Sequence, residues 1–249
     1  MYSDGGPMIR RGGVVVLLTW TVAMSIGSLA REQPDVRDAR ATLMRAHFSD
    51  GLRLHDAVAR GDLEAARLHA RTLAEHRPDV PFPTGAAVFF TLMQYAARDV
   101  DRAPVLEVAA RATAVLLTRC GECHAAQHVT PRVARHLDSA TLVAASMRDH
   151  QAAADLLLIG LVEPADASWE AGARDFARIR LPRDEMPDRQ LRARALIGDA
   201  RLTGLAAAAI DARRPPDRAR LYGRVLSTCA RCHQEHEVQS WGPNRLPPA

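Results

Sequence analysis

Hydrophobic residues recur along the chain with the three-to-four-residue spacing of helices, and no stretch shows the two-residue alternation of strands. The pattern predicts eight helices, over 37–59, 62–76, 85–98, 104–127, 139–161, 167–180, 188–210 and 217–236. Gly61 separates the first two helices, and three prolines between positions 78 and 83 separate the second from the third. Asp62 is a predicted N-cap, and Pro104 a predicted first-turn residue of the fourth helix. The sequence therefore predicts an all-α fold.

Composition supports a globular helical chain. Of the 249 residues, 47% are hydrophobic and 25% charged, which is typical of folded rather than disordered proteins. Aromatic residues make up only 4%, which favours closely approaching helices over a β-sandwich. The length fits one large domain or two of ordinary size.

Two copies of the pattern C-x-x-C-H contain every cysteine of the chain. Their residues are Cys120, Cys123 and His124 in the first copy, and Cys229, Cys232 and His233 in the second. This spacing is typical of c-type haem attachment, in which both thiols form thioethers and the histidine is the proximal iron ligand. A zinc site or a redox dithiol is the alternative, but neither needs a histidine directly after the second cysteine in both copies. The motifs therefore predict two haem c groups.

The two halves of the chain form a weak repeat. Cys229 lies 109 positions after Cys120, and Met44-x-x-His47 recurs as Met147-x-x-His150 at an offset of 103. The repeat predicts a tandem duplication, with a first haem c domain over 31–133 and a second over 134–249. Residues 1–30, which precede both, are expected to be a signal peptide. With four predicted helices in each half, both domains are expected to be four-helix bundles.

A four-helix bundle with C-x-x-C-H on its last helix resembles the cytochrome c′ and cytochrome c-556 family. The resemblance implies that the first helix crosses the distal face of the haem, where one of its residues binds or blocks the iron. Arg40-x-x-x-Met44 is similar to a first-helix pattern of that family, which favours Met44 and Met147 as sixth ligands. A histidine at the same place in both copies favours His47 and His150, which we rank first. An open distal site is the third alternative.

The remaining histidines do not follow the repeat. His55, His69, His76 and His136 have no counterpart in the other half. We expect them to be exposed to solvent or to cap helices.

The expected function is electron transfer by an exported dihaem cytochrome c, with redox proteins as partners and a homodimer as a possible assembly. A protein that binds or senses diatomic gases is the first alternative, and a haem peroxidase the second. No phosphate-binding loop, nucleophile elbow or zinc-protease motif indicates another chemistry. The net charge of +4 would be offset by the propionates of two haems, so no nucleic-acid partner is expected.

The N-terminal sequence predicts an export signal. Arg10 and Arg11 precede an apolar run over 14–26 and a small-residue stretch over 27–30. This run is shorter than the ~20 residues that a membrane-spanning helix needs. The sequence predicts a periplasmic protein, with an uncleaved signal anchoring it to the membrane as the alternative.

Overall fold

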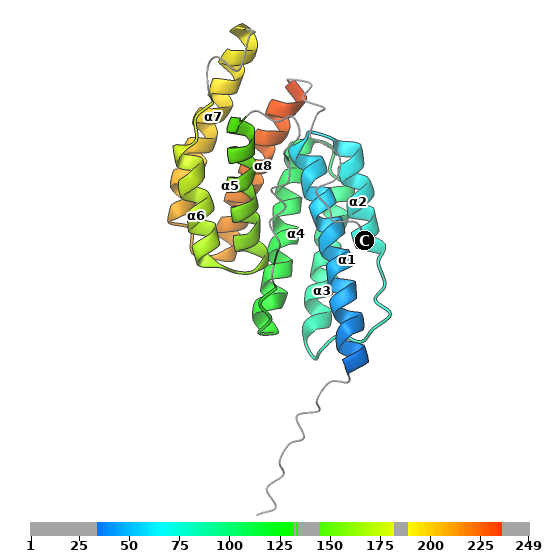
Figure 1. Cartoon of the computed structure of the whole chain (residues 1–249). Coiled ribbons are helices and arrows are strands. Elements are labelled where there is room, and N and C mark those ends of the chain that lie inside the picture. The colour runs from blue at the N-terminus through cyan, green and yellow to red at the C-terminus, as the bar shows by residue number, and fades with distance from the viewer. Residues whose placement is uncertain (1–33, 132, 134–144, 182–188, 236–249) are drawn as a thin grey trace, which may run out of the picture. The chain divides into compact units, whose positions relative to one another are not determined.

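Helices account for all the regular secondary structure in the described part of the chain. The computed structural model describes residues 34–131, 133, 145–181 and 189–235. Figure 1 shows the helices that it contains. They are α1 (Pro34–Ala59), α2 (Leu63–Glu75), α3 (Ala86–Asp101), α4 (Leu106–Ala126), α5 (Ala145–Val162), α6 (Asp166–Arg178), α7 (Arg189–Ile210) and α8 (Pro215–Glu235). The predicted all-α class is confirmed for these residues.

The predicted helix ends agree with the observed ones to within a few residues. One difference is at α4, which begins at Leu106 after the extended residue Val105, so Pro104 precedes the helix rather than lying in its first turn. The predicted start of the fifth helix at 139 lies outside the described residues, as does residue 134, where the second domain is predicted to begin. The predicted signal peptide over 1–30 also lies outside them.

The turn between α1 and α2 forms as the sequence predicts. Gly61 has φ +80, and its N–H and that of Asp62 bond back to Val58 and Ala57 at 3.0 and 2.9 Å. These two bonds form a Schellman motif, whose left-handed position glycine adopts without steric cost. The Asp62 side chain then accepts a hydrogen bond from the Ala65 N–H at 2.9 Å and caps α2.

Helices that are neighbours in the sequence pack against each other. Each helix from α1 to α7 contacts the next one along the chain. The most extensive contact in the described chain joins α4 to α8, the two helices that carry the cysteine motifs. They approach closely because Gly223 of α8 faces α4, where an added Cβ would lie 3.0 Å from the Arg111 Cα. The described residues from Pro34 onward thus belong to one compact unit.

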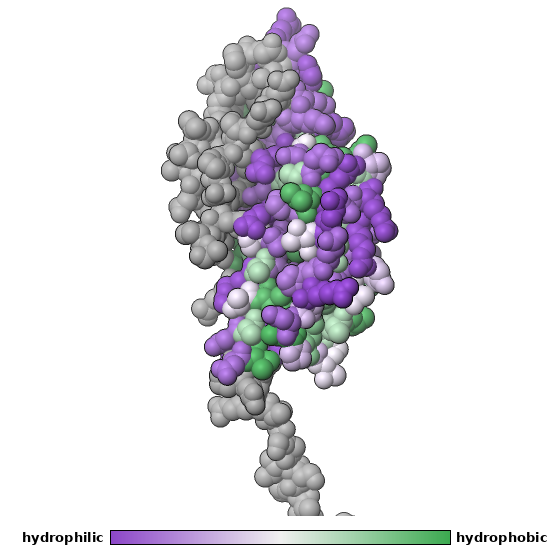
Figure 2. All heavy atoms as spheres, turned by 90° about the vertical axis from the view of Figure 1, so that its right-hand side faces the viewer, coloured by the Kyte–Doolittle hydropathy of each residue, from purple (hydrophilic) through white to green (hydrophobic). Residues whose placement is uncertain are grey.

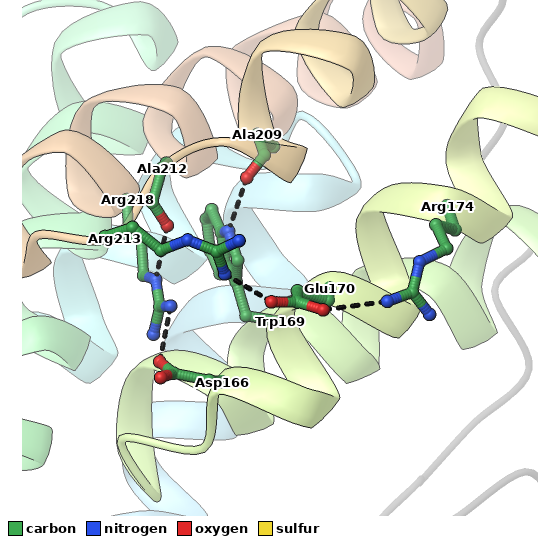
Figure 3. Close-up of polar contacts among 8 residues, drawn as sticks. All are labelled: Asp166, Trp169, Glu170, Arg174, Ala209, Ala212, Arg213 and Arg218. Carbon is green, nitrogen blue, oxygen red and sulfur yellow. Dashed lines mark hydrogen bonds and ion pairs between the residues drawn. The ribbon is translucent and has the colours of Figure 1, made fainter.

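Trp169 joins α6 to the end of α7 and to α8 (Figure 3). Its side chain is fully buried, and its indole N–H donates to the Ala209 carbonyl at 2.8 Å. The guanidinium of Arg218, itself 4% exposed, lies 5.3 Å from the indole ring centre and binds the Ala212 carbonyl and Asp166 at 3.0 and 2.6 Å. A large buried side chain with a satisfied N–H is a strong anchor for three helices.

We expect Trp169→Ala to lower the free energy of unfolding by about 3–5 kcal/mol, the usual cost of removing a buried tryptophan. Urea denaturation followed by circular dichroism measures this loss. Glu170→Ala is the matched control on the same helix, because Glu170 makes only surface ion pairs with Arg213 and Arg174 (Figure 3). Its effect is expected to be far smaller. Equal losses in the two variants would contradict the anchoring role of Trp169.

One face of the molecule is mostly polar. Seen from the side of α1, α2 and α3, the molecule is largely hydrophilic, with apolar areas scattered between the charged helix faces (Figure 2). No helix in the described residues combines the length and the apolar character that crossing a membrane requires.

Candidate functional site

Both C-x-x-C-H motifs lie near the C-terminal ends of long helices. Cys120, Cys123 and His124 are on α4, and Cys229, Cys232 and His233 are on α8. Helical spacing of three and four residues places the three side chains of each motif on neighbouring positions of one helix. Cys120 and Cys229 pack against the hydrophobic core, and all four thiols are free.

The two motif histidines make the same kind of hydrogen bond. The Nδ1 atom of His124 lies 2.7 Å from the Val162 carbonyl, and the Nδ1 atom of His233 lies 2.7 Å from the Ala59 carbonyl. A carbonyl only accepts, so Nδ1 carries the proton in both rings. The neutral imidazole then has its lone pair on Nε2, the nitrogen left to bind a metal. A hydrogen bond of this kind orients nearly every metal-binding histidine.

Val162 and Ala59 are the last residues of α5 and α1. Carbonyls in the final turn of a helix lack intrahelical donors, and the motif histidines supply them. The bond from His233 joins residues 174 apart, and the bond from His124 joins residues 38 apart. Each motif is therefore held by the first helix of the other set of four.

The second motif opens into a cavity. The cavity has a volume of about 50 Å³ and is partly open to solvent. Its lining includes Cys229, Cys232 and His233 from α8, and both candidate distal residues, Met147 and His150, from α5. The five residues assigned to the second haem thus come together around one cavity.

The first motif has its candidate distal residues on α1, which contacts α4. Both ring nitrogens of His47 are buried and have no hydrogen-bond partner. The ring lies against His76 and Phe90, with ring centres 4.3 and 5.1 Å apart. Burial, followed by the nearby His76, lowers the pKa of His47 to about 4, against a smaller opposing effect of Asp50. The ring is therefore neutral at physiological pH, as a metal ligand must be.

A buried imidazole without a partner is costly, which makes an iron at this position a physically sensible occupant. Met44, one helical turn earlier on α1, is half-buried and remains the alternative.

The second distal histidine has different neighbours. His150 is 7% exposed and its Nε2 lies 3.6 Å from a carboxylate oxygen of Asp199, which is equally buried. The ring also contacts Phe176 edge-on, with centres 5.8 Å apart. Beside it the amide nitrogen of Gln151, a residue 5% exposed, has no hydrogen-bond partner. The two distal environments are therefore not equivalent, although the sequence pattern is the same.

The thiols do not have the properties of a redox dithiol. Burial is the main cause that raises the pKa of Cys120 and of Cys229 to about 12, and it also raises the pKa of Cys123 and Cys232. A reactive C-x-x-C pair instead has a cysteine whose pKa is lowered. The thiols are thus protonated at neutral pH, which disfavours the dithiol alternative.

His55 was expected to be exposed or to cap a helix, and this prediction is wrong. The side chain is 2% exposed, and its Nε2 lies 2.8 Å from the hydroxyl of Tyr222, with Asp56 beside Nδ1 at 3.1 Å. Although it belongs to α1, His55 also lines the cavity of the second motif. Nothing local in the sequence indicates this position, because Tyr222 is 167 residues away. His76, in contrast, is the C-cap residue of α2.

In the described residues, no group of three or more His, Cys, Asp or Glu side chains is arranged to hold a bare metal ion. No protein-family model, curated protein or solved structure matches the chain. A function for the chain therefore has to be argued from its own residues.

Proposed function

We propose that the chain is an exported c-type cytochrome that holds two haem c groups and carries single electrons between redox proteins. The observation that carries the proposal is the matched setting of His124 and His233. Each directly follows a C-x-x-C pair, and each has its Nδ1 bonded to a helix-end carbonyl, which directs Nε2 toward an iron. Bound haem would supply the one-electron chemistry, as Fe(III) and Fe(II) interconvert.

The second cavity fits such a group by its donor set. Cys229 and Cys232 would form the thioethers, His233 would bind the iron, and His150 or Met147 would face it from α5. Apolar residues of α7 and α8, among them Leu202, complete the lining and would limit contact between water and the haem. On α4, Cys120, Cys123 and His124 would hold the first haem, with His47 or Met44 opposite.

The consecutive packing of α1–α4 and of α5–α8 supports two tandem four-helix bundles, and with them the resemblance to the cytochrome c′ and c-556 family. Covalent haem and the N-terminal signal both favour the periplasm. Partners would then be redox proteins of a periplasmic or membrane electron-transport chain.

Binding of a diatomic gas at the second haem is the alternative function that a specific observation favours. His150 lies beside Asp199, which would hold the imidazole away from the iron, and the unpartnered Gln151 amide is a donor for a small ligand. At the first haem, the unpartnered His47 ring favours a filled sixth position and electron transfer.

Expression in a bacterium that matures c-type cytochromes tests the proposal. We expect a red periplasmic protein that keeps its pigment in acidified acetone, because thioether bonds survive extraction. The pyridine haemochrome assay should give two haems per chain. Adding carbon monoxide to the reduced protein separates the two functions: an unchanged spectrum supports electron transfer, and a change confined to one haem supports gas binding. A colourless protein would contradict both.

A further inference from the structure

The first helix of each set of four carries residues that relate to both cysteine motifs. α1 carries Met44 and His47, the candidate distal residues of the first motif. The same helix ends at Ala59, whose carbonyl accepts the hydrogen bond from His233 of the second motif. α1 therefore carries the candidate distal residues of one motif and a hydrogen-bond acceptor for the histidine of the other.

α5 repeats the arrangement with the two motifs exchanged. It carries Met147 and His150, the candidate distal residues of the second motif. It ends at Val162, whose carbonyl accepts the hydrogen bond from His124 of the first motif. The same reciprocal contact thus occurs twice, at an identical distance of 2.7 Å.

We propose that these two helix ends are positioning groups that act across the halves: the Ala59 carbonyl tunes the second haem, and the Val162 carbonyl tunes the first. The proposal rests on the proposed function, because it requires an iron on each imidazole. Its consequence is that the reduction potential of each haem depends on a helix from the other half. Neither half then contains a complete haem site by itself.

The hydrogen bond acts on the iron through the imidazole. A carbonyl that accepts a hydrogen bond from the Nδ1–H group makes Nε2 more basic, and a more basic ligand stabilises Fe(III) over Fe(II). The negative end of the helix dipole adds to this effect, since both carbonyls lie at helix C-termini. Weakening the bond should therefore raise the potential of the haem on that histidine.

Close packing holds each carbonyl in place. A Cβ at Gly61 would lie 2.9 Å from the carbonyl oxygen of Ala230, the residue that follows Cys229 in the second motif. The matching residue of the first motif is Gly121, where a Cβ would overlap the Leu161 carbonyl. The end of each first helix thus lies directly against the C-x-x-C segment whose histidine it holds.

The lining of the second cavity is an independent sign of the same arrangement. His55 and Ala59 of α1 line it together with Cys229, Cys232 and His233. The cavity that would hold the second haem is thus completed by a helix from the first half.

Gly61→Ala and Gly85→Ala form a matched pair that tests the proposal in the intact two-haem protein. Both glycines have left-handed backbones, with φ +80 and +82, so alanine strains both turns similarly. The added Cβ at position 61 meets α8, whereas at position 85 nothing lies within 4 Å. Gly61→Asn is the milder second variant, because asparagine tolerates this conformation while its Cβ still contacts Ala230.

The readout is a redox titration monitored by proton NMR. Signals of the second haem are identified by their through-space contacts with cavity-lining residues such as Leu226. We expect the variants at Gly61 to raise the reduction potential of the second haem by about 59 mV. For one electron this corresponds to a tenfold lower Fe(III)/Fe(II) ratio at a given solution potential. Exchange of the His233 Nδ1 proton should accelerate in parallel. Gly85→Ala should change neither quantity.

Equal potentials in the Gly61 and Gly85 variants, or a shift confined to the first haem, would overturn the proposal while leaving two haems per chain. Absence of covalent haem from the unmodified protein would instead overturn the proposed function. The haem assay therefore distinguishes the two failures.

Discussion

Serine at both Cys229 and Cys232 is expected to leave the purified protein with one covalently bound haem instead of two. The two cysteines line the same cavity as His233, and no other cysteine is available to that site. A haem held by the histidine alone would dissociate under denaturing conditions, because only thioether bonds survive them. The pyridine haemochrome assay and the mass of the denatured chain both measure this loss.

Arg231→Ala is the control for this variant. Arg231 lies inside the same motif but is exposed and is not one of its three defining residues, so both haems should remain. The mirror variant, with serine at Cys120 and Cys123, should lose the other haem alone. Two covalent haems in either double-serine variant would refute the assignment of these cysteines.

Much of the fold could be predicted because its signals are local. Gly61, Asp62 and the proline-rich segment after α2 mark helix ends through backbone conformation and capping, which depend on a few neighbouring residues. The C-x-x-C-H motifs are equally local, since one helical turn brings their side chains together. The start of α4 shows the limit of such reasoning, because Pro104 suits the first turn of a helix and equally the residues before it.

The contacts between the two halves could not be predicted in this way. Nothing in the sequence near His233 indicates that its imidazole binds the Ala59 carbonyl, and the partner is a backbone atom without a sequence signal. The burial of His55 beside Tyr222 depends on the same association. A tandem repeat suggests independent domains, but the two helices that carry the cysteine motifs, α4 and α8, pack against each other.

The two candidate distal histidines differ in their surroundings although their sequence pattern is shared, and the difference arises within each half. His47 lies among aromatic rings contributed by the first four helices, whereas His150 lies beside a carboxylate of α7. If both sites hold iron, residues outside the Met-x-x-His pattern would decide which ligand reaches it, so each site needs its own test.

His47→Phe is expected to convert the first haem from low spin to high spin and to leave the second haem unchanged. Phenylalanine keeps the ring contacts with His76 and Phe90 but has no nitrogen for the iron. Electron paramagnetic resonance of the oxidised protein reads the spin state of each haem. Met44→Leu is the matched variant on the same helix and should leave the spin state unchanged. The opposite pattern would assign the sixth position to methionine.

The same substitution should stabilise a chain that lacks the first haem through serine at Cys120 and Cys123. There His47 has two buried nitrogens without partners, so His47→Phe should raise the free energy of unfolding by about 1–3 kcal/mol. The gain should grow as the pH falls from 6.5 toward 4. In this range the unfolded chain binds a proton at His47 that the folded chain excludes, because burial lowers its folded pKa to about 4. Urea denaturation at several pH values measures this gain. If His47→Phe stabilises the chain that lacks the first haem and also abolishes the low-spin signal in the chain that holds both, His47 is present for the iron. Destabilisation of the chain that lacks the first haem would instead assign His47 to packing.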